Sequence, residues 1–170
     1  MLKKLTILVV FACSYSYGFE RNGWPGEGIP VISFAKKEIT FCEKPSNDDS
    51  CKLQHVTKDV KMSLVDYSGL YIKQTLYITK IPVEMIAKRS FSIGNHEIDK
   101  GDKLTKYQYA AEGAYYIGIG DKVIQVDLYN YEEHLEGFQH KPVVEWWVKF
   151  IGKGWAQVNE ENFIFHDREF

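Results

Sequence analysis

The sequence predicts an all-β fold, and three observations support this prediction. Apolar residues recur with a period of two between residues 70 and 78, so that Leu70, Ile72, Leu76 and Ile78 share one face of a strand. Short runs rich in β-branched and aromatic residues recur along the chain, with glycine-containing turn signals between them. No segment keeps a helical period over more than about ten residues, apart from a weak pattern at 129–136.

The remaining elements follow in chain order. Residues 19–37 form an N-terminal segment, of which 19–28 hold three glycines and a proline and are expected to be a flexible entry. Beyond the 70–78 strand, which should be half buried, the sequence predicts strands at 31–35, 39–42, 103–109, 114–119, 122–128, 143–151 and 155–158. Turn signals lie at 68–69, 100–102, 118–121 and 152–154.

The composition describes a globular chain with little affinity for nucleic acid. The 170 residues are 45% hydrophobic, which is enough to bury a core in one domain or two small ones. The formal net charge is −2, and the chain has no long basic run. Because binding to phosphates requires clustered Lys and Arg, we expect no nucleic-acid partner.

The first 18 residues have the pattern of a secretory signal peptide. Lys3 and Lys4 supply the positive start, residues 5–12 are apolar, and Ser16-Tyr17-Gly18 has the small-x-small pattern of a cleavage site. Cleavage after Gly18 would make Phe19 the first residue of the mature chain. The sequence therefore predicts a periplasmic or secreted protein.

Cys13 allows a second interpretation of the same segment. Residues 10–13 loosely resemble a lipoprotein cleavage site, which would place a lipid on Cys13 and tether the protein to a membrane. Phe11 is bulky where such sites have a small or branched residue. A membrane tether is therefore the weaker alternative.

Cys42 and Cys51 are the two cysteines that follow the predicted signal peptide. They flank a polar, turn-rich stretch, residues 43–50. An even number of cysteines in an exported protein indicates a disulfide, here across a hairpin-like loop.

The chain also has the pattern of a weak internal duplication. Residues 58–72 are echoed by residues 100–117, and the spacing from Val83 to Phe91 equals that from Trp155 to Phe163. We therefore expect two β modules, at 38–94 and 95–170, with a boundary near Gly94-Asn95.

The most specific string is residues 145–159, in which Trp146-Trp147 precede a Gly-Lys-Gly turn and then Trp155. This string resembles the distal hairpin of Src-homology-3-like domains, particularly the bacterial exported type. The resemblance implies two small barrels in tandem, the second clearer than the first. Ala156 and Gln157 stand where the proline-peptide readers of that family carry Pro, so binding of proline motifs is not expected.

Trp146 and Trp147 are adjacent on a strand and should point to opposite faces. We expect one of them in the core and Trp147, which shares its face with Glu145 and Lys149, on the surface. There it would pack against the 129–142 loop or the other module, or it would line a ligand groove. The expected groove residues are Trp147, Tyr115, Tyr107, Trp155 and Glu145.

The motifs of common catalytic sites are missing from the sequence. It has no Gly-x-Ser-x-Gly elbow, phosphate loop or His-Glu-x-x-His motif, and Cys42 and Cys51 are expected to be paired. His134 and His140 share one stretch, but a spacing of six is not a recognised metal-ligand set. We therefore expect no enzyme activity, cofactor or metal.

These observations together favour an exported, non-catalytic binding module. Its ligand would be an envelope protein, a peptide or a cell-wall glycan, held in the aromatic groove. One alternative is an inhibitor or immunity-type protein that blocks a secreted enzyme with its 129–142 loop. A remote alternative is a hydrolase that acts through His134 and neighbouring carboxylates.

Overall fold

The computed structural model describes residues 19–23, 31–62 and 72–166, and in these residues it confirms the all-β class. Four strands form an antiparallel sheet in the order β1-β5-β13-β14. Their bounds are β1 Glu20–Asn22, β5 Ile72–Ile81, β13 Val143–Phe150 and β14 Gly154–Gln157. The long pairing of β5 with β13 forms the centre of this sheet.

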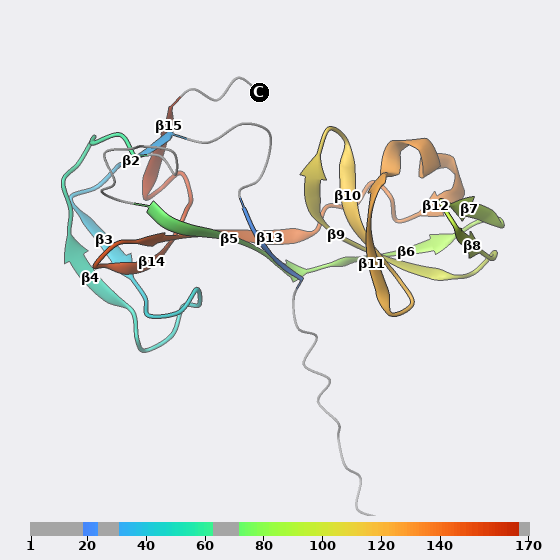
Figure 1. Ribbon diagram of the computed structural model, residues 1–170, viewed down its shortest axis with the longest axis horizontal. Helices are drawn as coiled ribbons and strands as arrows, with labels where there is room; N and C mark the ends of the chain where they lie inside the picture. The colour runs from blue at the N-terminus through green and yellow to red at the C-terminus, as the bar shows by residue number, and fades with distance from the viewer. Residues whose placement is uncertain (1–18, 24–30, 63–71, 167–170) are drawn as a thin grey trace, which may run out of the picture.

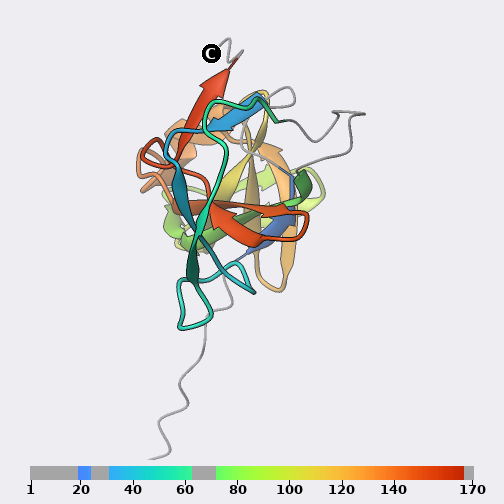
Figure 2. The same ribbon diagram turned by 90° about the vertical axis from the view of Figure 1, so that its left-hand side faces the viewer.

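Two strand pairs complete what we call the first lobe. β2 (Val31–Phe34) pairs with β15 (Phe163–His166), and β3 (Glu38–Phe41) pairs with β4 (Lys52–His55). Figure 2 looks onto this lobe, with β2 and β15 at the top and the β3–β4 turn at the bottom. Its buried core includes six large aromatic side chains, namely Phe34, Phe41, Tyr77, Trp146, Phe150 and Phe163.

The second lobe is built from residues 83–142. A five-stranded sheet has the order β11-β10-β9-β6-β12, and β7 and β8 form a separate hairpin. The bounds are β6 Val83–Ala87, β7 Phe91–Ile93, β8 His96–Ile98, β9 Lys103–Ala111, β10 Ala114–Ile119, β11 Lys122–Asp127 and β12 Leu135–Glu136. A 3-10 helix, η1 (Leu128–His134), links β11 to β12. Among the described residues, no helix has the length and apolar character needed to cross a membrane.

The second lobe is an insertion between two paired strands of the first. β5 leads through Pro82 directly into β6, and the chain returns through β13, which pairs with β5. Figure 1 shows the two lobes at opposite ends of the long axis, with β5 and β13 between them. The two lobes have separate hydrophobic cores.

This topology differs from the predicted division into modules 38–94 and 95–170. Gly94-Asn95, the expected boundary, is the turn of the β7–β8 hairpin. β5 and β13, from the two predicted halves, pair with each other along most of their length. Neither lobe forms a closed barrel within the described residues, because their strands are divided among separate sheets.

Each expected strand has a counterpart in the structure, although the expected half-burial of β5 is wrong. Ile78 on one face and Thr75, Tyr77 and Thr79 on the other are all buried. The reason is that β5 is an inner strand with side chains packed on both sides of its sheet. Leu70, which the predicted strand includes, lies outside the described residues. Within the expected entry segment, residues 20–22 form β1.

Candidate functional site

Both tryptophans of β13 are buried, so the expectation that Trp147 faces outward is wrong. Trp146 is 5% exposed and belongs to the core of the first lobe. Trp147 is only 1% exposed and packs with Ile78 and Trp155 in a separate cluster. The two side chains lie in different clusters, as adjacent strand positions should, but each face is covered.

The cover over Trp147 includes the predicted disulfide, which the structure confirms. Cys42 and Cys51 are joined with an S–S distance of 2.09 Å. Cys42 also pairs with Trp155 through backbone hydrogen bonds in both directions, each 2.8 Å long. The disulfide and the end of β3 therefore lie against Trp147 and Trp155 and keep water from that face.

Glu145 supports the buried indole of Trp147. The Trp147 Nε1–H donates a hydrogen bond to Glu145 Oε2 over 2.9 Å. Lys80 Nζ lies 3.8 Å from the same carboxylate oxygen. Trp147, Trp155 and Glu145 thus form a structural cluster of the first lobe.

Tyr107 and Tyr115, the other two expected groove residues, lie in the second lobe. The ring of Tyr107 contacts Phe19, with 5.0 Å between the ring centroids. Tyr115 packs against the core of the second lobe, and its burial raises the pKa of its hydroxyl. The structure therefore does not bring the five predicted residues together in one groove.

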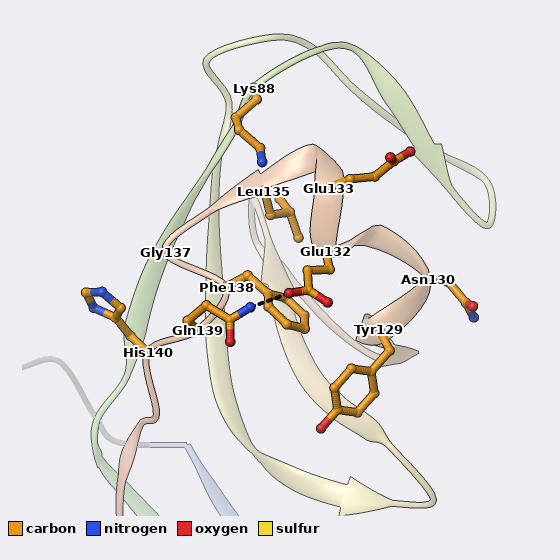
Figure 3. A pocket seen from close by; sticks show the side chains of 10 residues that line it. All are labelled: Lys88, Tyr129, Asn130, Glu132, Glu133, Leu135, Gly137, Phe138, Gln139 and His140. Carbon is orange, nitrogen blue, oxygen red and sulfur yellow. Dashed lines mark hydrogen bonds between the residues drawn. The ribbon is translucent and has the colours of Figure 1, made fainter.

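An open cleft in the second lobe offers a better candidate site, which we call the η1 cleft. Its volume is about 730 Å³. It lies between η1, β12 and the loop that follows them, within the 129–142 segment that the sequence predicts as a loop (Figure 3). The lining residues are Lys88, Tyr129, Asn130, Glu132, Glu133, Leu135, Gly137, Phe138, Gln139 and His140.

Buried side chains and one glycine hold the walls of the η1 cleft in place. Leu128, Leu135 and Phe138 are buried in the core of the second lobe. Gly137 has a φ of +81°, and a Cβ there would lie 2.8 Å from the backbone oxygen of Glu84. Only glycine fits this close approach without a shift of the backbone.

Lys106 holds the loop that contains Phe138 in place. Its side chain is buried, and its ammonium group donates a hydrogen bond to the backbone oxygen of Phe138. The same nitrogen lies 5.3 Å from the ring centroids of both Tyr115 and Phe138. Burial lowers the pKa of Lys106, and the nearby charge of Lys141 lowers it further.

The cleft combines an aromatic ring with planar polar groups. Tyr129 is 60% exposed, and its ring centroid lies 5.8 Å from that of Phe138. Gln139 donates a hydrogen bond through Nε2 to Glu132 Oε1 (Figure 3). Lys88, which follows β6, approaches the cleft from another part of the chain, so both charge signs are present.

His134 is held by a neighbouring arginine. Arg89 Nε donates to His134 Nδ1 over 2.7 Å, and Arg89 also forms an ion pair with Glu133. His140 lies across the η1 cleft from Glu133 (Figure 3). Among the described residues, no three His, Cys, Asp or Glu side chains are grouped so that they could hold a metal ion.

In comparisons with known proteins, no family model matched the chain, and neither did any curated protein or solved structure. What the η1 cleft can bind is therefore inferred from its own side chains. The sequence signal for this site is the predicted 129–142 loop. Lys88 carries no such signal, because it reaches the cleft only through the pairing of β6 with β12.

Proposed function

We propose that this chain is an exported, non-catalytic binding protein that holds a cell-wall glycan in the η1 cleft. The observation that carries this proposal is an exposed aromatic ring, Tyr129, beside the hydrogen-bonded pair of Glu132 and Gln139. The resemblance of residues 145–159 to exported Src-homology-3-like domains is consistent with this role.

The chemistry of the cleft suits a sugar. A pyranose ring has an apolar face, which packs on an aromatic ring, and hydroxyl groups at its edge, which donate to carboxylate and amide oxygens. Tyr129 supplies the ring, and Asn130, Glu132 and Gln139 supply the polar groups. Pockets with apolar walls and a few placed polar groups are typical of small-ligand sites.

The walls of the cleft are fixed by contacts within the protein. Leu135 and Phe138 are buried, and Lys106 holds the Phe138 carbonyl. A site that is already ordered loses less conformational entropy when it binds. The packing of this lobe therefore favours binding of a small ligand.

The inhibitor alternative depends on a loop that can enter another protein. Here the 129–142 segment folds against its own lobe, with Leu135 and Phe138 buried, and its outer side is hollow. This shape favours a segment that receives a ligand over one that plugs an enzyme.

Export is part of the same proposal. Residues 1–18, the predicted signal peptide, lie outside the described residues. N-terminal sequencing of protein from the cell envelope should begin at Phe19. A mature chain that begins at a lipid-modified Cys13 would support the membrane tether instead.

Co-sedimentation of the mature chain with purified cell-wall sacculi tests the binding. We expect the double variant Glu132→Ala/Gln139→Ala to bind about tenfold more weakly, a loss of about 1.4 kcal/mol. Glu160→Ala, which removes an exposed carboxylate of the first lobe, is the matched control and should bind normally. Equal binding by all three proteins would refute the η1 cleft as the glycan site, and capture of a secreted enzyme from envelope lysate would favour the inhibitor.

A further inference from the structure

A second hollow lies in the first lobe, away from the η1 cleft, and we call it the Phe34 pocket. Its volume is about 290 Å³. Its lining residues are Phe34, His55, Val56, Thr57, Val60, Met62, Phe150, Ile151 and Lys153. None of these residues belongs to the site proposed above.

The floor of the Phe34 pocket is the hydrophobic core itself. Phe34, Val56, Met62 and Phe150 are each at most 4% exposed. The rings of Phe34 and Phe150 lie 5.2 Å apart between centroids. A ligand that enters this pocket must therefore present an apolar group.

The mouth of the pocket carries positive charge. Lys153 Nζ donates to the backbone oxygen of His55 over 3.3 Å and lies 5.6 Å from the ring centroid of Phe41. No ion pair of Lys153 is found among the described residues, and no carboxylate is among the lining residues. The ammonium group is thus held in place beside an apolar pocket without a neutralising partner there.

A shallow hollow continues the surface beyond His55. It is lined by Lys36, Lys37, Glu38, Leu53 and His55. Lys36 forms an ion pair with Glu161, and Glu38 carries a negative charge. Lys37 is therefore the second lysine, besides Lys153, that contributes positive charge near the pocket. Leu53, at 64% exposed, adds apolar surface next to it.

We propose that the Phe34 pocket binds a small anionic amphiphile, namely a carboxylate on a medium-length acyl chain. The chain would lie on Phe34, Met62 and Phe150, and the carboxylate would meet the ammonium group of Lys153. The positive charge at the mouth attracts a carboxylate, and the apolar floor favours an acyl chain. A ligand with both groups should therefore bind more tightly than a neutral polar ligand.

Calorimetric titration of the mature chain with octanoate and with 1-octanol tests this proposal. We expect octanoate to bind more tightly than octanol. Lys153→Gln should weaken octanoate binding about tenfold and leave octanol unchanged. Lys122→Gln, which removes an exposed lysine of the second lobe, is the control and should bind octanoate normally.

A blocking variant separates the pocket from nonspecific binding. Thr57 is an exposed residue at the mouth, so Thr57→Trp should abolish binding of both probes while thermal unfolding stays cooperative. The proposal is overturned if octanoate does not bind, if Thr57→Trp still binds it, or if the two lysine variants behave alike. Sacculus binding tests the η1 cleft and octanoate binding tests the Phe34 pocket, so either proposal can be refuted without the other.

Discussion

Thr79 Oγ1 donates a hydrogen bond to Gln108 Oε1 over 3.1 Å, and both side chains are buried. Thr79 belongs to β5 of the first lobe and Gln108 to β9 of the second, so this bond joins the two lobes away from solvent. The Nε2 group of Gln108 has no hydrogen-bond partner among the described residues. The junction between the lobes therefore contains a buried amide that is only partly satisfied.

A double-mutant cycle on this pair should show strong coupling. Thr79→Val leaves the Gln108 amide without its partner and should lower the free energy of unfolding by about 1–3 kcal/mol. Adding Gln108→Leu removes the buried amide and should restore most of this loss. Urea unfolding measures the free energies of the single and double variants, and Thr40→Val, at an exposed position, is the control. Strictly additive effects of the two substitutions would contradict the coupling.

Either tryptophan of β13 should be costly to remove. Trp146→Ala and Trp147→Ala should each lower the free energy of unfolding by about 3–5 kcal/mol, because both indoles are buried. Leu53→Ala, at an exposed position, should change it by less than about 0.5 kcal/mol. If denaturant unfolding shows that Trp147→Ala is as stable as the parent, Trp147 does not pack as described.

The disulfide should stabilise the first lobe. Replacing both partners, Cys42→Ala/Cys51→Ala, should lower the free energy of unfolding by about 2–3 kcal/mol, since the unfolded chain loses a closed loop. The parent should become equally unstable in reductant, whereas the double variant should not respond to it. A parent protein that is labelled by a thiol reagent without reduction would contradict the pairing.

Lys106 should give the stability a pH dependence. Its folded pKa lies below the ordinary value of 10.5, so between these two values the unfolded chain binds the proton and the folded chain does not. Stability therefore rises with pH within that window and is lowest, for this group, below the folded pKa. Unfolding of Lys106→Met at a series of pH values should lack this rise; identical slopes for both proteins would exclude it.

Local elements are predictable from the sequence because their signals are local. The strand predicted at 114–119 occurs as β10, and the disulfide follows from two cysteines around a turn. The burial of both tryptophans is not predictable, because the disulfide segment that covers Trp147 packs from a distant part of the chain. The same limit applies to the insertion, since the pairing of β5 with β13 leaves no local signal.

The candidate site is predictable only as a loop. The sequence predicts a loop at 129–142, but it predicts that the ligand binds Trp147 and Tyr107, whose side chains pack against other parts of the chain. The cleft depends on how Gly137 approaches Glu84 and on how Lys106 holds Phe138. These contacts join the loop after β12 to β6 and β9, and a pattern along one stretch of sequence does not contain them.

The insertion of one lobe into the other also sets an order for folding during synthesis. β5 is made before the whole second lobe, and its partner β13 is made only afterwards. Contacts within the second lobe are closer in sequence, so that lobe can form while the first still lacks its central pairing. Until β13 has been made, one edge of β5 is unpaired. A strand of another chain can pair with this edge, which leads to aggregation. The disulfide joins two residues that both precede β5, so in an oxidising compartment it can close before Trp147 and Trp155 pack against it.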